Sequence, residues 1–444
     1  MVAGRPSEGE TVLGASWERV FLFLTACLAS TVVLKVGQVQ YLEMLYAVQI
    51  VVLLAAFSRS DWQVTLYKPI AALGLLYLAF LAVATGLAIW ALRSDFYIAE
   101  GVSPLKYPGT ISLIRAAELT VSLSAMIYLA HLFRRDDRKA RFAMRVYFRV
   151  GVASAVYGLL TYPLARAHLV YLGTSADYRV RGFYNEGGPY GLYVMSALFV
   201  GFSLRQLRWE RQIWMVLGIP LLFFAFVGSQ SKAAMAALLA VGLIDLLLLR
   251  STAQRLVVAG GVVATLLLVS QVADVAAGLR LYRQASLAYE RASYQHKNDP
   301  NFIVGRVAGA FIVPRMVAEH PLAGVGWGNY GLVRNAPEYR GASAWVDISD
   351  EPALGLAGLA AELGLPLTGF LILCLILPAI YLFRRGVPLP LMNLALLQPI
   401  AHLFGAQLNL TYPWIVTAFA LGIGLRSGRS IESASGKTLQ TKLA

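Results

Sequence analysis

The chain has 444 residues, of which 58% are hydrophobic and 14% are charged, and its mean hydropathy is +0.63. That balance is too apolar for an ordinary soluble domain and favours an integral membrane protein. The net charge of +14 is accompanied by no basic helix or zinc motif, so we expect a membrane surface or anionic lipid and no nucleic acid as partner. Cys27 and Cys374 lie in separate apolar runs, which argues against a disulfide or thiolate metal site.

Apolar runs recur along the chain, and a helix needs about 20 such residues to cross a bilayer. We expect helices at 20–36, 42–57, 69–92, 110–132, 150–171, 188–204, 214–227, 233–249 and 256–272, then at 352–382, 388–404 and 412–425. The sequence therefore predicts an all-α integral membrane protein with about twelve transmembrane helices and one large external loop. The expected division is 1–272 for the first helices, 273–351 for the loop, 352–425 for the last helices and 426–444 for a tail.

Lysine and arginine are concentrated in alternate connections between these helices. The residues concerned are Arg59, Lys68, Arg134, Arg135, Arg138, Lys139, Arg141, Arg145, Arg149, Arg205, Arg208, Arg211, Arg250, Arg255, Arg384, Arg385, Arg426, Arg429, Lys437 and Lys442. Because basic connections stay in the cytoplasm, we expect both termini there, with 273–351 in the periplasm. The expected location is a bacterial inner membrane. The stretch before the first helix has no small-residue cleavage site, so we expect that helix to remain in the membrane.

Five cations fall instead at predicted external helix ends: Lys35, Arg115, Arg179, Arg181 and Lys232. Each could snorkel to head groups, and Arg115 could pair with Glu118 at helical spacing. As a group they favour an anionic ligand, because several cations suit a diphosphate and the arginine fork matches phosphate oxygens. The pattern indicates a lipid-linked diphosphate as substrate.

Four segments in chain order resemble the motifs of bacterial O-antigen polymerases and O-antigen ligases. The first two are Arg179-Val-Arg-Gly-Phe-Tyr-Asn-Glu-Gly-Gly and Gly228-Ser-Gln-Ser-Lys-Ala-Ala, in which Lys232 takes the place of the family's arginine. The third is Arg306 followed by Glu319-His-Pro-Leu-Ala-Gly-Val-Gly-Trp-Gly-Asn-Tyr. The fourth begins at Glu351 and runs through Glu362 into the tenth predicted helix.

The resemblance implies a glycosyltransferase-C-like membrane fold and a reaction that needs no metal, cofactor or nucleotide sugar. Such enzymes move glycans from undecaprenyl diphosphate to an acceptor hydroxyl, so the implied partners are a lipid-linked donor and acceptor, the bilayer and a chain-length regulator. Ligases of the family carry a histidine before the tenth helix, where this chain has Asp347-Ile-Ser-Asp-Glu-Pro. This departure favours a polymerase over a ligase acting on lipid A core or protein. A transporter or flippase is a further alternative, although we detect no internal repeat.

For the implied reaction, Arg181, Lys232 and Arg306 are the main candidates to stabilise the leaving diphosphate. Arg115, Arg179 and Lys35 are secondary candidates for the same role.

Asp350, Glu351 and His320 are the candidates for the base that deprotonates the acceptor hydroxyl. Asp350 could instead be an N-cap before Pro352. His320 could instead belong, with the glycines after it, to a helix-to-loop turn. Gln398 and His402 are interpreted as interhelical hydrogen-bond partners, with Glu362 as a candidate partner for them.

Overall fold

The computed structural model describes residues 15–31, 35–36, 39–59, 67–91, 109–167, 169, 179–184, 187–249, 251–272, 306–334, 336–340, 355–403, 408 and 410–440. These residues are almost entirely helical. One short antiparallel pair, β1 (Lys35–Val36) and β2 (Val39–Gln40), joins the first two helices.

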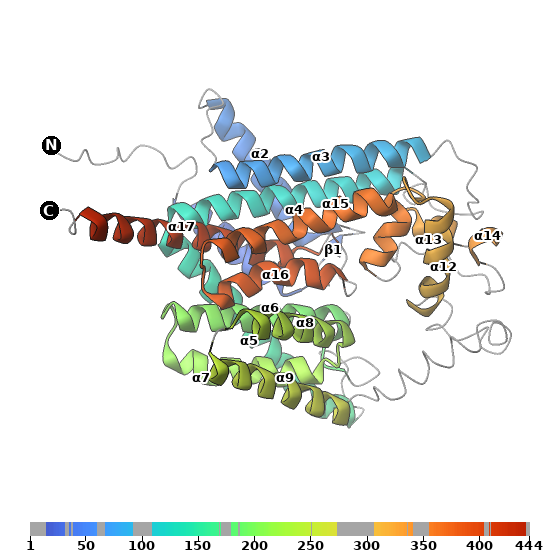
Figure 1. Cartoon of the computed structure of the whole chain (residues 1–444). Coiled ribbons are helices and arrows are strands. Elements are labelled where there is room, and N and C mark those ends of the chain that lie inside the picture. The colour runs from blue at the N-terminus through green and yellow to red at the C-terminus, as the bar shows by residue number, and fades with distance from the viewer. Residues whose placement is uncertain are drawn as a thin grey trace.

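Every predicted apolar run overlaps a helix. The helices are α1 (Ala15–Ala29), α2 (Tyr41–Arg59), α3 (Lys68–Ala91), α4 (Thr110–Arg135), α5 (Asp137–Arg166), α6 (Gly187–Gln206), α7 (Gln212–Gly228), α8 (Lys232–Leu248), α9 (Thr252–Val272), α15 (Leu356–Arg384), α16 (Leu389–Leu403) and α17 (Tyr412–Gln440). Between α9 and α15 lie α12 (Arg306–Glu319), α13 (Tyr330–Val333) and α14 (Pro337–Arg340). Figure 1 shows the long helices packed side by side in a bundle, with α12 and α13 at one end of it.

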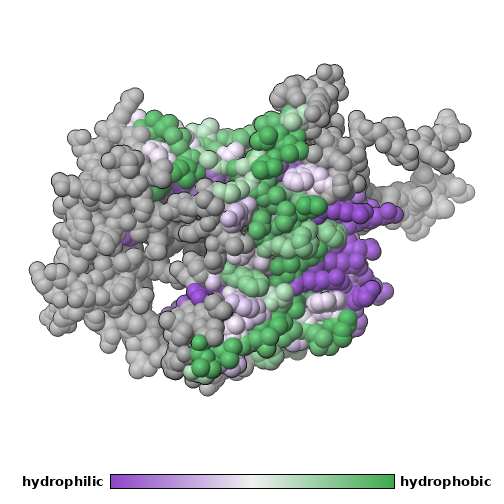
Figure 2. Space-filling view, turned by 180° about the vertical axis from the view of Figure 1, so that it is seen from behind, coloured by the Kyte–Doolittle hydropathy of each residue, from purple (hydrophilic) through white to green (hydrophobic). Residues whose placement is uncertain are grey.

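Within the described residues, four helical stretches are long and apolar enough to cross a membrane: Lys68–Trp90, Thr110–Arg135, Gly187–Gln206 and Gly358–Arg384. Several shorter apolar helices accompany them. Figure 2 shows hydrophobic side chains across the middle of one face and hydrophilic ones gathered toward its right-hand edge. The fold is therefore that of a helical membrane protein, while the number of twelve crossings and the side of each connection stay predictions.

Two helix boundaries differ from those that the apolar runs predicted, at the end of α1 and at the start of α5. The first helix ends at Ala29, and Lys35–Val36, at the end of the predicted apolar run, belong to β1 instead. α5 begins at Asp137, well before the predicted 150, because Asp136 caps it and accepts from the backbone N–H groups of Arg138 (2.8 Å) and Lys139 (3.4 Å). Hydropathy does not detect this capped polar half of the helix.

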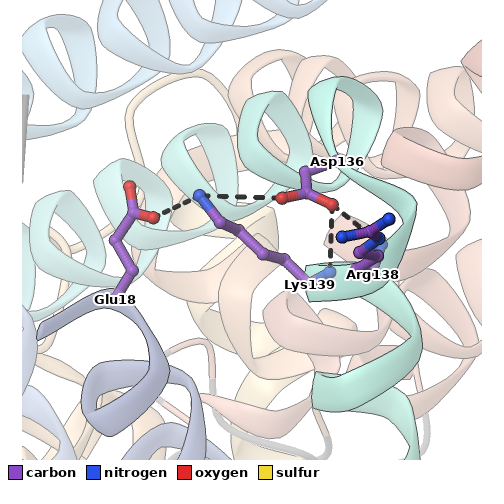
Figure 3. A network of polar contacts seen from close by, with 4 residues as sticks. All are labelled: Glu18, Asp136, Arg138 and Lys139. Atoms are coloured by element: carbon purple, nitrogen blue, oxygen red, sulfur yellow. Dashed lines mark hydrogen bonds and ion pairs between the residues drawn. The ribbon is translucent and has the colours of Figure 1, made fainter. Parts of the chain in front are cut away.

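A polar network ties the α4–α5 junction to the start of α1 (Figure 3). The Lys139 ammonium forms an ion pair with Glu18 and lies 3.9 Å from the second carboxylate oxygen of Asp136. Asp136 therefore caps α5 with one oxygen and attracts a cation with the other. The contact fixes α1 against the junction between two longer helices.

Other basic connections meet at the same end. The Arg134 guanidinium stacks 3.7 Å from the ring centroid of Tyr67, and Arg385 donates to the Tyr67 hydroxyl at 3.5 Å. Arg426 pairs with Asp137 at 2.8 Å. The ends of α4, α15 and the apolar part of α17 thus lie together with the start of α3. We refer to this as the basic end of the bundle.

Candidate functional site

The segment before α6 is bonded to the turn between α7 and α8. The backbone N–H of Val180 donates to the carbonyl of Gly228 at 2.9 Å. The Arg179 side chain donates from Nε to the carbonyl of Ser229 at 3.0 Å and from a terminal nitrogen to that of Gln230 at 3.4 Å. The first two motifs, about fifty residues apart in sequence, therefore form one structural unit, which we name the arginine–serine unit.

Small residues allow the starts of α6 and α8 to meet closely within this unit. A Cβ atom on Gly191 would lie 2.4 Å from the Cβ of Ser231, which no real side chain tolerates. The Ser231 hydroxyl caps α8 by accepting from the backbone N–H of Ala234 at 3.2 Å, and it donates to the carbonyl of Gly188 at 2.8 Å. Two helix N-termini are thus held together, and both direct their positive dipole ends to one place.

The predicted cations of this unit differ in their surroundings. Lys232 is the first residue of α8 and is exposed. Arg181 is half-buried and precedes Gly182, whose φ of 52° favours glycine. Arg179 is half-buried and holds backbone carbonyls, so its role in the structure is at least partly to join the two motifs. The backbone segments that carry Arg179, Arg181 and Lys232 therefore lie close together, while their role toward an anionic ligand stays a prediction.

The third and fourth motifs form a second unit, in which a break in α15 meets the turn after α12. The helix is interrupted at Gly364, where φ is 73° and ψ is 168°. The backbone N–H of Leu365 donates to the carbonyl of Pro321 at 2.8 Å. A Cβ on Gly364 would lie 2.4 Å from the carbonyl oxygen of Leu322. Only glycine fits this crossing of two backbones, which we name the α12–α15 clasp.

Two more hydrogen bonds close the clasp. The N–H of Val325 donates to the carbonyl of Ala361 at 2.9 Å, and that of Gly326 donates to the carbonyl of Glu362 at 2.9 Å. The break in α15 leaves these carbonyls without helical partners, so the glycine-punctuated turn replaces the missing bonds. The interpretation of the glycines as parts of a helix-to-loop turn is confirmed, and the turn also pairs with α15.

A buried carboxyl group lies inside the clasp. Glu362 is 5% exposed, and one of its side-chain oxygens accepts from the backbone N–H of Tyr330 at 3.2 Å. The Arg115 guanidinium lies within electrostatic range of this carboxyl group and donates to Glu118 at 3.0 Å. The pairing of Arg115 with Glu118, which was the alternative to a ligand-binding role, is present in the structure. These contacts of Glu362 were not predicted, since the sequence suggested Gln398 and His402 on α16 as its partners.

The clasp also holds the start of α4. The Ser112 hydroxyl donates to the carbonyl of Trp327 at 2.5 Å. Arg115 lies one turn further along the same helix, and a Cβ on Gly328 would stand 3.5 Å from its side chain. The turn therefore positions Arg115 through contacts with the helix that carries it.

His320, a candidate base, is half-buried at the end of α12. Its Nε2 atom lies 2.8 Å from the hydroxyl of Tyr339 in α14. Burial, together with the nearby carboxylates of Glu319 and Glu338, raises the pKa of Tyr339 above its usual value. Tyr339 therefore keeps its proton, and its hydroxyl forms a hydrogen bond with Nε2 in either direction, according to the histidine tautomer, which orients the imidazole ring.

Several predicted site residues fall outside this description. Asp350 and Glu351 lie outside the described residues, as do the side chains of Lys35 and Arg306, whose backbones belong to β1 and the start of α12. Among the described residues, no group of three or more His, Cys, Asp and Glu side chains could hold a metal ion.

Both units lie at the end of the bundle opposite the basic end. The Tyr184 hydroxyl of the arginine–serine unit donates to the carbonyl of Ala29 at 2.7 Å, at the far end of α1 from Glu18. Ser112 of the clasp contact lies at the far end of α4 from Arg134. Figure 1 shows α12 and α13 at this end, away from the projecting part of α17.

Compared with known protein families and with curated protein sequences, the chain matches no family and no curated protein.

Proposed function

We propose that the chain is a membrane glycosyltransferase that polymerises undecaprenyl-diphosphate-linked oligosaccharide repeats into O-antigen or exopolysaccharide. One observation carries the proposal. The four segments that resemble motifs of this enzyme family pair into two backbone-bonded units at a single end of the bundle, opposite the basic end. Separate cations with unrelated structural roles would have no reason to gather in this way.

In the proposed reaction, the acceptor hydroxyl oxygen attacks the anomeric carbon of the donor glycan. The bond from that carbon to the diphosphate oxygen breaks, with inversion, and the diphosphate leaves with the bonding electron pair. Arg181, Lys232 and Arg306 stabilise the charge that develops on the diphosphate, because preorganised cations act most strongly in a water-poor site. Metal is not required, since diphosphate is already an activated leaving group.

The acceptor proton passes to a base, for which Asp350, Glu351 and His320 are the candidates. The contact with Tyr339 orients the His320 imidazole, and the ring can accept the proton at Nδ1 when its Nε2–H donates to the Tyr339 hydroxyl oxygen. Arg115, paired with Glu118 and close to Glu362, is a further cation at the proposed site and a secondary candidate for diphosphate contacts. Arg179 and Lys35 remain secondary candidates for diphosphate contacts.

The proposed location is a bacterial inner membrane, with the basic end in the cytoplasm and the candidate site on the periplasmic face. The gathering of basic connections at one end supports this orientation by the positive-inside rule. A ligase acting on lipid A core or protein is the alternative function. The missing histidine before α15 argues against it.

Glycan analysis of cells that lack the protein tests the proposal. A polymerase predicts lipid A that carries a single repeat, or a secreted glycan reduced to single repeats. Loss of all capping, with lipid-linked polymer accumulating, would show a ligase instead. Single repeats retained at the cytoplasmic face would show a flippase, and an unchanged glycan profile would contradict all three functions.

A further inference from the structure

The helix α6 carries a line of hydroxyl groups into the interior of the bundle. Tyr190, Tyr193 and Ser196 are spaced three residues apart and therefore share one face of the helix. All three are fully buried, and 83% of the apolar window of α6 is buried, more than in any other candidate span. This face cannot meet lipid, so its hydroxyl groups meet the neighbouring helices.

Some of these hydroxyl groups have clear partners. Ser196 bonds to the hydroxyl of Tyr147 in α5 at 2.6 Å. Tyr184, which packs against Tyr193 with ring centroids 5.5 Å apart, donates to the carbonyl of Ala29. These two hydrogen bonds show that buried hydroxyl groups in this part of the bundle can have protein partners.

Four neighbouring hydroxyl groups differ. Within the described part of the chain, the side-chain oxygens of Ser154, Tyr190, Tyr193 and Tyr412 are completely enclosed and make no hydrogen bond. The Tyr193 and Tyr412 rings are 6.1 Å apart. Ser154 interacts with the Tyr190 hydroxyl, and Ser30 with the Tyr193 hydroxyl, in both cases without reaching hydrogen-bond geometry. We name these four groups the hydroxyl cluster.

An enclosed hydroxyl without a partner destabilises a protein, and the penalty is greatest in apolar surroundings. Four such groups gathered in one place are therefore not expected in a stable bundle, unless small polar molecules bridge them. Ordered water does this in folded proteins wherever two or more polar partners surround a space. We propose that the hydroxyl cluster is an internal water-binding site, in which ordered water molecules bridge Ser154, Tyr190, Tyr193 and Tyr412.

This water site would lie directly beneath the arginine–serine unit. A Cβ on Gly182 would stand 2.5 Å from the Ser154 hydroxyl oxygen and 2.5 Å from the Tyr190 ring. The Arg181–Gly182 segment thus covers the hydroxyl cluster from the candidate site. The bound water would thus lie between the Arg181–Gly182 segment and the interior of the bundle.

X-ray radiolytic labelling of the full-length protein in lipid nanodiscs tests the proposal. Radiation converts internal water to hydroxyl radicals, which oxidise the side chains beside it. Tyr190, Tyr193 and Tyr412 should be oxidised several-fold faster than Tyr77, which is equally buried but donates to the carbonyl of Cys374 at 3.2 Å. Oxidation of all three cluster tyrosines at the slow rate of Tyr77 would overturn the proposal.

The variant Tyr193→Phe gives an independent test with a distinct sign. If water bridges the cluster, removing the hydroxyl breaks a bonded network and lowers the melting temperature. If the site is dry, the same change removes an unsatisfied group and raises it. Tyr77→Phe is the matched control, which should lower the melting temperature in either case. A rise for Tyr193→Phe would overturn the proposal, and neither readout depends on glycan transfer.

Discussion

At the scale of residues, the clasp depends on a carboxyl group that is enclosed by protein. Glu362 accepts a backbone N–H of Tyr330 and attracts Arg115. Removing one partner of such a pair leaves the other buried without compensation. The sequence could not reveal this role, because the partners lie on α4 and α13, far from Glu362 along the chain.

The variants Glu362→Gln and Glu362→Ala separate the hydrogen bond from the charge. Glutamine can still accept from Tyr330 and loses only the attraction to Arg115, whereas alanine loses both. We expect alanine to lower the free energy of unfolding by about 1–3 kcal/mol and glutamine by less. Thermal unfolding in detergent measures the order, and an alanine variant as stable as the unaltered protein would contradict the assignment.

Glu210, in the connection between α6 and α7, predicts a dependence of stability on pH. Burial opposes its ionisation, but Arg149 donates two hydrogen bonds (3.0 and 2.8 Å) and Arg211 a backbone N–H, so its pKa is lowered. A lowered folded-state pKa stabilises the fold above the ordinary pKa of glutamate, and this contribution is lost as pH falls through the folded value. The pair is partly exposed, so the effect is roughly 1 kcal/mol or less.

The measurement compares melting temperatures of the unaltered protein and Glu210→Gln. The variant should melt lower at neutral pH, and the difference should shrink as the pH falls below the ordinary pKa of glutamate. A difference that stays constant down to strongly acidic pH would show that the carboxylate charge makes no contribution.

At the scale of elements, the apolar runs predicted where helices lie but not how they are interrupted. Run length and hydropathy located α1 to α9 and α15 to α17, because burial in lipid selects apolar residues. The polar start of α5 escaped this signal, as it depends on the Asp136 cap. The pairing of motifs into two units was also not predictable, since backbone hydrogen bonds between distant segments leave no periodic pattern.

Gly364 tests the break in α15. Its backbone conformation is almost confined to glycine, and a Cβ would collide with the carbonyl of Leu322. We expect Gly364→Ala to lower the free energy of unfolding by about 1–3 kcal/mol. Gly369→Ala in the same helix is the matched control, since its Cβ meets nothing within 4 Å. Equal melting temperatures for the two variants would contradict the clasp.

At the scale of the whole molecule, the structure separates two chemically different ends. One gathers the basic connections through Lys139, Arg134 and Arg426. The other holds the arginine–serine unit and the α12–α15 clasp. By the positive-inside rule, this difference between the two ends predicts the orientation of the protein in the membrane.

Reporter fusions test the orientation. A fusion after Asp299 should report a periplasmic position, while fusions after Lys139 and Arg385 should report cytoplasmic ones. The reason is that Lys139 and Arg385 belong to the basic end, whereas Asp299 lies between α9 and α12 along the chain, in the segment 273–351 that the sequence predicts to be periplasmic. A cytoplasmic signal after Asp299 would place the candidate site on the wrong side for lipid-linked glycan polymerisation.

The proposed polymerase activity can be measured with the purified protein in liposomes that contain lipid-linked repeats, with a metal chelator present. We expect the unaltered protein to form a ladder of lengthening glycans. Arg181→Gln should polymerise at a rate about 10² lower, as expected for loss of one preorganised electrostatic donor. Arg255→Gln, an exposed arginine near the start of α9, should keep the full rate. The proposed function would be contradicted if correctly folded protein formed no ladder. The proposed role of Arg181 would be contradicted if Arg181→Gln formed the ladder at the full rate.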